Sequence, residues 1–322
     1  MGSGRRKRKK TGKRLLYGII AITFVLACIL SYFYLQQPQP KEWAHKAAIV
    51  DHLSFRNETA NQTFVNASGN VLEKAGFVVD YYGGEEVTVD FYKGLLTRGY
   101  GLIVLRVHSA LIGTTESLGL FTSEHYYPDN IPPAYYEDAY HKRLVEAYFT
   151  EEERERGESY FAITPNFIEE YGNFRDTTVI IMGCDGLKYN RTAEAFIKEG
   201  AKVCIGWNGL VSTPHTDYAT TCLLQCLARE NTVDKAVEDT MNEVGAEKMY
   251  FQDQGYNSTL KYYPEDVGSY TFQLMLDASI TDTVEAKTFM PNSRADQATV
   301  NWLQSFILEK RKVKSVEEID RV

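Results

Sequence analysis

The chain has 322 residues, 44% of them hydrophobic, so it is long enough for one or two domains with real cores and too apolar to be disordered throughout. Residues 1–14 carry eight of the 35 basic residues and no acidic one, which leaves 27 basic against 43 acidic residues in the remainder. A remainder with a formal charge of −16 repels nucleic acid and anionic lipid headgroups, so we exclude nucleic acid as a partner.

The N-terminal region predicts a membrane anchor. After the basic tail, residues 15–35 contain no charge and read LLYGIIAITFVLACILSYFYL, which is long enough to cross a bilayer. Basic residues remain on the cytoplasmic side, so we expect a cytoplasmic N-terminus, a single span and an extracytoplasmic main domain. The sequence QQPQP opens a short extended linker over residues 36–45.

This apolar run has two other interpretations. A cleaved signal peptide would have a shorter apolar region that ends in small residues, whereas this run ends in Tyr-Phe-Tyr-Leu. A lipoprotein signal is suggested by Val-Leu-Ala before Cys28, but the apolar run continues past that cysteine. The uncleaved anchor is therefore favoured.

Asparagine sequons also fit an exported domain. Three of the five occur within ten residues, which is denser than chance, although Asn and Thr also mark helix starts and turns. The candidate glycosylation sites are Asn57, Asn61, Asn66, Asn190 and Asn257.

Strands and helices are expected to alternate through the first part of the domain. Residues 47–50, 77–82 and 102–107 are short apolar runs typical of buried strands, and helices are expected between them at 57–75 and 89–96. A long segment, residues 109–176, follows; it is rich in Tyr, Glu and Pro, and a charged helix is expected near residues 140–157.

The same alternation resumes after this segment. The expected strands are residues 177–182 and 201–207, and the expected helices are residues 192–198, 215–229 and 232–244. Near the C-terminus, a strand is expected at 270–276 and a helix at 300–310. The main domain is expected to cover residues 46–280, and a C-terminal extension to cover residues 281–322.

This order predicts an α/β fold. The apolar strands do not alternate with polar residues, which is typical of a mainly parallel sheet covered by helices on both faces, a three-layer sandwich. Ligands bind such sheets beyond the carboxyl ends of the strands, so residues that directly follow a strand are the best functional candidates.

Two such residues carry reactive side chains. His108 follows the third expected strand and Cys184 follows the fourth, so both emerge at one sheet edge if the strands are neighbours. A thiol needs a base to become a nucleophilic thiolate, and an imidazole can take that proton and later return it to the leaving amine. The small residues Gly183 and Gly186 leave room for a substrate backbone and for amide groups that stabilise an oxyanion.

The other cysteines and histidines suggest no such chemistry. Cys204 lies in an apolar strand, while Cys222 and Cys226 share one helix face without good disulfide geometry or a second ligand pair for zinc. No nucleotide-binding loop, metal-ligand cluster or haem motif is present, so we expect neither metal nor cofactor.

The stretches VLRVHSA and IIMGCDGL resemble the caspase–hemoglobinase fold of cysteine peptidases, in which a histidine follows one central strand and a cysteine follows the next. The stretch AEAFIKEGAKVCIGWNGLVSTPHTDYATTCLLQCL is similar to the CHAT and gingipain-like members, through Gly200, Ala201, Trp207 and Asp217. The resemblance covers residues 46–245. It implies that His108 is the general base and Cys184 the nucleophile.

Two positions depart from the family pattern. Ser109 occupies a position that is often glycine, and Gly183 one that is usually alanine. Both are small enough to keep the backbone geometry, and both are candidates for oxyanion or substrate binding. Asp185 would favour a basic residue before the scissile bond, or else caps a helix. Trp207 either forms a wall of the substrate cleft or fills the core.

Two functions follow from this resemblance. The first is a membrane-anchored cysteine endopeptidase that hydrolyses peptide bonds with a His108/Cys184 dyad. The second is a catalytically inactive surface binding or scaffold domain of the same fold, since fold does not imply activity. In either case residues 109–176 are far longer than an ordinary connection, and we expect them to form a lid or a substrate-binding wall over the two residues.

Overall fold

The computed structural model describes Tyr17 and residues 45–229, 231–251 and 254–271. The described residues from 45 onward form an α/β domain around a six-stranded sheet of order β12-β9-β8-β3-β1-β2. Five strands are parallel, and β12 pairs with β9 in the antiparallel sense. The strands are β1 (Lys46–Asp51), β2 (Val78–Gly83), β3 (Leu102–Arg106), β8 (Thr177–Ile181), β9 (Ala201–Trp207) and β12 (Leu260–Tyr263).

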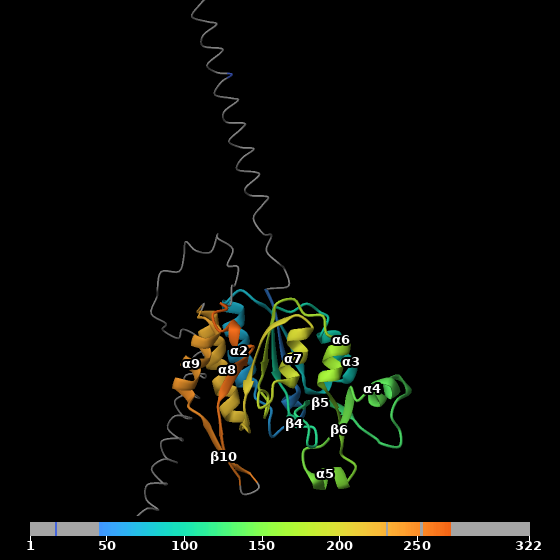
Figure 1. Ribbon diagram of the computed structural model, residues 1–322. Helices are drawn as coiled ribbons and strands as arrows, with labels where there is room; N and C mark the ends of the chain where they lie inside the picture. The colour runs from blue at the N-terminus through green and yellow to red at the C-terminus, as the bar shows by residue number, and fades with distance from the viewer. Residues whose placement is uncertain (1–16, 18–44, 230, 252–253, 272–322) are drawn as a thin grey trace, which may run out of the picture. The chain divides into compact units, whose positions relative to one another are not determined.

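Helices cover both faces of this sheet, so the expectation of a mainly parallel sheet between helical layers is confirmed. Successive residues of β3 enter opposite cores: Ile103 and Leu105 pack on one face, Leu102 and Val104 on the other. Figure 1 shows the two groups of helices on either side of the strands. One group is α3 (Val89–Leu95), α6 (Pro165–Tyr171) and α7 (Arg191–Lys198), and the other is α2 (Gln62–Lys74), α8 (Thr213–Ala228) and α9 (Val233–Val244).

The long segment after β3 is folded differently from its prediction. It contains a second, antiparallel sheet of order β4-β5-β7-β6. The charged helix expected near residues 140–157 is present only as the short α5 (Glu151–Glu155), because the strand β6 (Leu144–Ala147) occupies the first half of that range. Lys142 has a positive φ of 55°, which ends the preceding turn of helix and lets the chain turn into that strand. The elements are β4 (Ser109–Leu111), β5 (Leu118–His125), α4 (Tyr136–Tyr140), β6 (Leu144–Ala147), α5 (Glu151–Glu155) and β7 (Tyr160–Ile163).

The C-terminal part of the domain also differs from its prediction. A hairpin of β10 (Glu247–Phe251) and β11 (Gln254–Ser258) precedes the edge strand β12. The strand expected at 270–276 is not seen in its described part, where Thr271 forms only an isolated bridge with Thr232. Residues 272–322, with the expected helix at 300–310, lie outside the described residues. Four 3-10 turns complete the described elements: η2 (His52–Phe55), η3 (Gly84–Glu86), η4 (Pro133–Tyr135) and η5 (Glu265–Val267).

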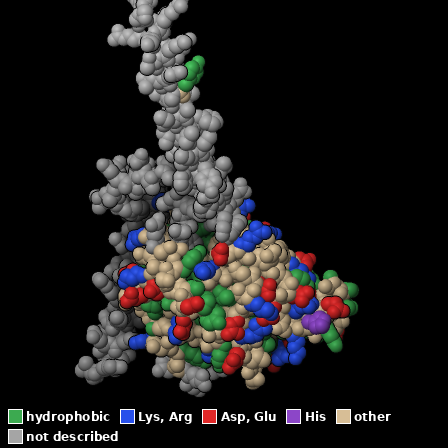
Figure 2. Space-filling model, turned by 45° about the horizontal axis from the view of Figure 1, so that its top comes forward, with side chains coloured by type: hydrophobic (Ala, Val, Ile, Leu, Met, Phe, Trp, Pro, Cys, Tyr) green, Lys and Arg blue, Asp and Glu red, His purple; other side chains and the backbone are tan. Residues whose placement is uncertain are grey.

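The surface carries charges of both signs. On the face presented in Figure 2, Lys and Arg side chains are interspersed with Asp and Glu side chains. One such group joins two helices, because Lys198 of α7 donates to Glu169 of α6 at 2.8 Å. Exposed pairs of this kind contribute little to stability, so the domain depends mainly on its two cores.

Candidate active site

His108 and Cys184 line the same cavity, of about 290 Å³, at the carboxyl edge of the central sheet. They come together because β3 and β8 are adjacent and parallel, with Leu105 opposite Ile181 in the register. The expectation that these two strands are neighbours is therefore confirmed. Segments after β1, β6 and β9 contribute other lining residues, among them Arg56, Phe149, Val211 and Ser212.

Cys184 is part-buried and its thiol is held by the backbone of the loop after β9. The sulfur accepts from the Val211 N–H and donates to the Val211 carbonyl, both at 3.5 Å. Burial raises the pKa of the Cys184 thiol above its usual value, and the neighbouring Asp185 carboxylate adds to this. The resting thiol is therefore protonated near neutral pH and needs a base to become a nucleophile.

His108 presents a neutral imidazole to the cavity. Its ring packs edge-on against Phe121 and at a tilt against Phe149, with centroid separations of 4.6 and 4.9 Å. Burial lowers the pKa of His108 to about 4, with a further contribution from the Arg56 guanidinium. A neutral imidazole can accept a proton, although no hydrogen bond among the described residues joins it to the Cys184 thiol.

The loop that carries Cys184 passes close to Ser109. The Ser109 hydroxyl donates to the Cys184 carbonyl at 2.7 Å. A Cβ added at Gly183 would lie 2.1 Å from the Ser109 Oγ and 2.6 Å from the Val107 carbonyl, so only glycine fits there. Among the described residues, neither the Gly183 nor the Cys184 N–H donates a hydrogen bond to another backbone or side-chain group. Both residues line the cavity, so their amides are candidate donors to a ligand.

Asp185 does not line the cavity. Its backbone is in the left-handed region, with φ of 57°, and its carboxylate lies 3.5 Å from the Lys188 ammonium. It does not cap a helix either, because the next helix, α7, has Asn190 as its N-cap residue.

Trp207 also lies away from the cavity, in the core at the end of β9. Its side chain is completely buried, and its indole N–H donates to the Thr216 hydroxyl at 3.0 Å. That hydroxyl in turn donates to the Met182 carbonyl at 2.9 Å. Trp207 therefore supports a cavity-lining residue, Thr216, without forming a wall of the cavity itself.

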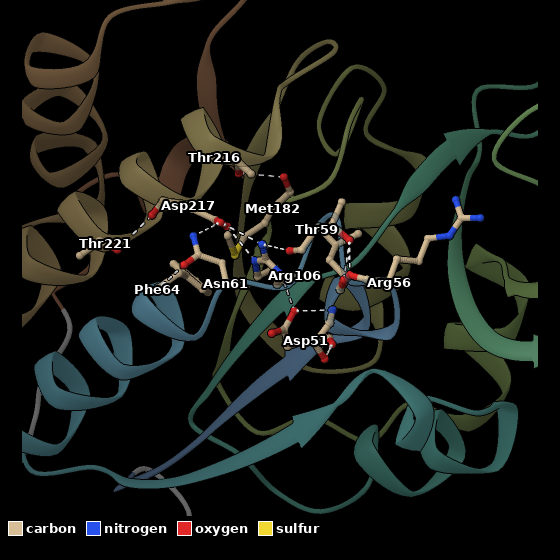
Figure 3. Close-up of polar contacts among 12 residues, drawn as sticks. Asp51, Arg56, Thr59, Asn61, Phe64, Arg106, Met182, Thr216, Asp217 and Thr221 are labelled. Carbon is tan, nitrogen blue, oxygen red and sulfur yellow. Dashed lines mark hydrogen bonds and ion pairs between the residues drawn. The ribbon is translucent and has the colours of Figure 1, made fainter. Parts of the chain in front are cut away.

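A buried charge network lies next to the cavity and was not foreseen from the sequence. Arg106, the last residue of β3, pairs with Asp51 at 2.6 Å and with Asp217 at 2.7 Å, and all three are at most 1% exposed. The Arg106 guanidinium also donates to the Thr59 carbonyl at 2.7 Å. Figure 3 shows Arg106 between the two carboxylates, whereas the Arg56 side chain points away from this group. The network ties β1, β3 and α8 together.

The second sheet reaches the cavity through one residue, Phe149, which belongs to the segment 109–176. The Arg56 guanidinium lies 4.2 Å from the Phe149 ring centroid and pairs with Glu153 of α5 at 2.6 Å. Below them, the buried His52 ring stacks parallel to Phe149 with a centroid separation of 6.3 Å. Neither Arg56 nor Phe149 carries a local sequence signal, because their contact is made only in the folded chain.

The sequons differ in their surroundings. Asn57, Asn66, Asn190 and Asn257 are exposed. Asn61 is half-buried: its side-chain oxygen caps α2 by accepting from the Phe64 N–H, and its amide donates to Asp217 at 2.8 Å. The structure thus gives Asn61 a local role that the other four do not share.

No family model matches this chain, and a search of curated proteins finds no significantly similar relative. Within the described residues, no helix combines the length and apolar character needed to span a bilayer. The anchor predicted at residues 15–35 lies outside these residues except for Tyr17. Nor does the described part contain three His, Cys, Asp or Glu side chains grouped to hold a metal ion.

Proposed function

We propose that this chain is a cysteine endopeptidase of the caspase–hemoglobinase type, with Cys184 as nucleophile and His108 as general base. The observation that carries the proposal is the shared cavity: an imidazole and a thiol follow two adjacent parallel strands and line one opening. The neutral state of both groups suits a mechanism in which the base removes the thiol proton as substrate binds.

The reaction proceeds in two stages. His108 takes the Cys184 proton, and the sulfur attacks the scissile carbonyl carbon to give a tetrahedral oxyanion, for which the Gly183 and Cys184 amides are donors. The carbon–nitrogen bond then breaks as His108 gives its proton to the leaving amine, and a thioester remains on Cys184. Water, deprotonated by His108, hydrolyses the thioester and releases the acid and the free thiol.

Turnover of a peptide library tests the assignment. Cys184→Ala and His108→Ala should each lower kcat/KM by ~10³-fold or more, since dyad members act as a unit. Cys222→Ala is the matched control, because that cysteine lies on α8 outside the cavity and should not affect turnover. Turnover that survives in Cys184→Ala would exclude this mechanism.

A catalytically silent binding domain is the second candidate. It is favoured by the hydrogen bonds that hold the Cys184 sulfur to Val211 and leave it unbonded to His108. A thiol-reactive peptide probe separates the two candidates. An active dyad is labelled at Cys184 in preference to Cys222 and Cys226, whereas a silent domain shows no such preference.

The proposed site of action is the outer face of a membrane, with residues 15–35 as the anchor and residues 1–14 in the cytoplasm. The supporting observation is the charge asymmetry of the sequence around this run. Protease added to intact cells should remove the domain and leave the first residues protected. Protection of the whole chain would contradict this topology.

A further inference from the structure

The peptide group that follows Cys184 is held at both of its polar ends. Its carbonyl, from Cys184, accepts from the Ser109 hydroxyl at 2.7 Å. Its N–H, from Asp185, donates to the Gly209 carbonyl at 2.9 Å. Because a peptide group is planar and rigid, two such bonds fix its orientation and so the backbone of Cys184.

This peptide has a conformation that the chain does not adopt readily. Asp185, on its C-terminal side, has φ of 57°, which is uncommon for a residue with a side chain. Such a backbone persists only where the surrounding structure holds it. The bonds from Ser109 and to Gly209 supply that restraint, one from the strand after His108 and one from the loop after β9.

Ser109 is built into this place. Its side chain is 2% exposed, and its Oγ occupies the space that any side chain at position 183 would need. A hydroxyl at position 109 and a glycine at position 183 are therefore complementary. The two departures from the family pattern noted in the sequence belong to a single contact.

We propose that Ser109 is a positioning residue for the reaction at Cys184. Its hydroxyl holds the Cys184–Asp185 peptide so that the sulfur and the free Gly183 and Cys184 amides keep their places at the cavity. Ser109 acts through the Cys184 carbonyl and does not line the cavity itself. This inference rests on the proposed peptidase function.

The experiment compares Ser109→Thr with Ser109→Val in the full chain. The two replacements have the same shape, so only the hydroxyl distinguishes them. We expect kcat for peptide turnover to stay within a few-fold of wild type in Ser109→Thr and to fall ~10- to 100-fold in Ser109→Val with little change in KM, because a small misplacement of a reacting group is costly. Equal kcat values in the two folded variants would overturn the proposal. If the added methyl prevents folding, Ser109→Ala, which adds no volume, replaces Ser109→Val and is compared with wild type for the same loss of kcat.

A second readout does not depend on catalysis. Hydrogen exchange at the Asp185 amide should be at least ~10-fold faster in Ser109→Val than in Ser109→Thr, because the peptide loses one of its two restraints. Ser123→Ala is the control: its hydroxyl donates to the Glu85 carbonyl at 3.2 Å, away from the cavity, and its loss should alter neither readout. A wild-type protein without turnover would overturn the peptidase function, while unchanged exchange at Asp185 would by itself overturn the role of Ser109.

Discussion

The two sheets of this domain are stabilised in different ways. The inner strands of the central sheet, β1, β3, β8 and β9, are buried on both faces between apolar cores, and a fully buried charge network lies at their carboxyl edge. The second sheet gives one face to a main core, through Leu120, Phe161 and Ile163. Beside the cavity its other face packs into a small aromatic cluster, which consists of His52, Phe55, Phe121 and Phe149. The first arrangement fixes the two candidate catalytic residues, and the segment that holds the second sheet brings Phe149 to the cavity that they line.

The largest expected effect comes from the charge network. Asp217→Ala removes one partner of the buried Arg106 and should lower the free energy of unfolding by about 3–5 kcal/mol, since it breaks a buried ion pair and leaves the guanidinium Nε without its acceptor. Urea unfolding of the purified domain measures this. Glu170→Ala is the control: Glu170 pairs with Arg143 on the surface at 2.5 Å, and its loss should cost about 1 kcal/mol or less. An equal loss in free energy of unfolding in the two variants would contradict the conclusion that the buried network contributes more to stability than a surface ion pair.

Acid should destabilise the aromatic cluster through His52. Burial lowers the pKa of His52 to about 3, with added repulsion from His108 and Arg56, so the folded state keeps it neutral. In the unfolded chain it takes up a proton near its ordinary pKa of about 6.5. Its contribution to stability is therefore full above about pH 6.5 and is lost as pH falls toward 3.

The test of this prediction is His52→Phe, which keeps an aromatic ring between Phe55 and Phe149. As the pH is lowered from 6.5 to 4, the Tm for thermal unfolding should fall less steeply in this variant than in wild type. His108, which titrates in the same window, and its neighbours Arg56 and Glu153 are the same in both proteins. The exposed His141→Gln variant should follow wild type, and a parallel fall in His52→Phe would exclude His52 as the cause.

Removal of α5 tests whether residues 109–176 act as a lid over the cavity. Residues 150–157 connect β6 and β7, which are antiparallel neighbours with Ala147 opposite Tyr160, so a short Gly-Ser turn can replace them without loss of the sheet. We expect the domain to fold and Cys184 to be alkylated several-fold faster, because Arg56 loses its partner Glu153. Alkylation at the wild-type rate, with unchanged peptide selectivity, would exclude a role for this segment as a lid or substrate-binding wall.

The smallest expected effect is that of one ion pair. Glu153→Gln should change the free energy of unfolding by less than about 1 kcal/mol, because Arg56 remains part-exposed and stacked on Phe149. Limited proteolysis around residues 149–157 should nevertheless increase. Arg154→Gln is the matched control: Arg154 lies on the same helix as Glu153, and its pair with Glu146 of β6 is more exposed. Increased cleavage in the control alone would contradict the role of the Arg56–Glu153 pair.

The central sheet could be predicted because its strands are continuous apolar runs bounded by turn residues. The strand at 201–207 was expected with the same bounds that the structure shows for β9. The positions of His108 and Cys184 at one edge follow from the adjacency of two such strands. Their sequence neighbours, Ser109 and Gly183, could be identified from the sequence as departures from the family pattern. The contact between Ser109 and Gly183 could not be predicted, because the two segments that carry them are 74 residues apart and meet only in the folded chain.

The second sheet escaped prediction partly because three of its strands, β4, β6 and β7, have only three or four residues each. β6 reads LVEA between Arg143 and Tyr148, and acidic and basic residues at helical spacing around it indicated a helix. In the folded chain this segment instead forms a strand, because it pairs with β7. Arg106 was equally hidden: an arginine at the end of an apolar strand has no local partner, and both carboxylates that neutralise it come from distant parts of the chain.

That distance has a consequence for the order in which the protein folds. Arg106 and Asp217 are 111 residues apart, so the guanidinium Nε and Nη2 donors lack their carboxylate acceptor, and β3 cannot be buried with these donors satisfied, until α8 has been synthesised. Until then the first three strands carry an arginine that must stay hydrated, which keeps the early chain open. A nascent chain that ends before residue 213 should therefore remain loose and protease-sensitive, and the chain should become compact only when α8 arrives.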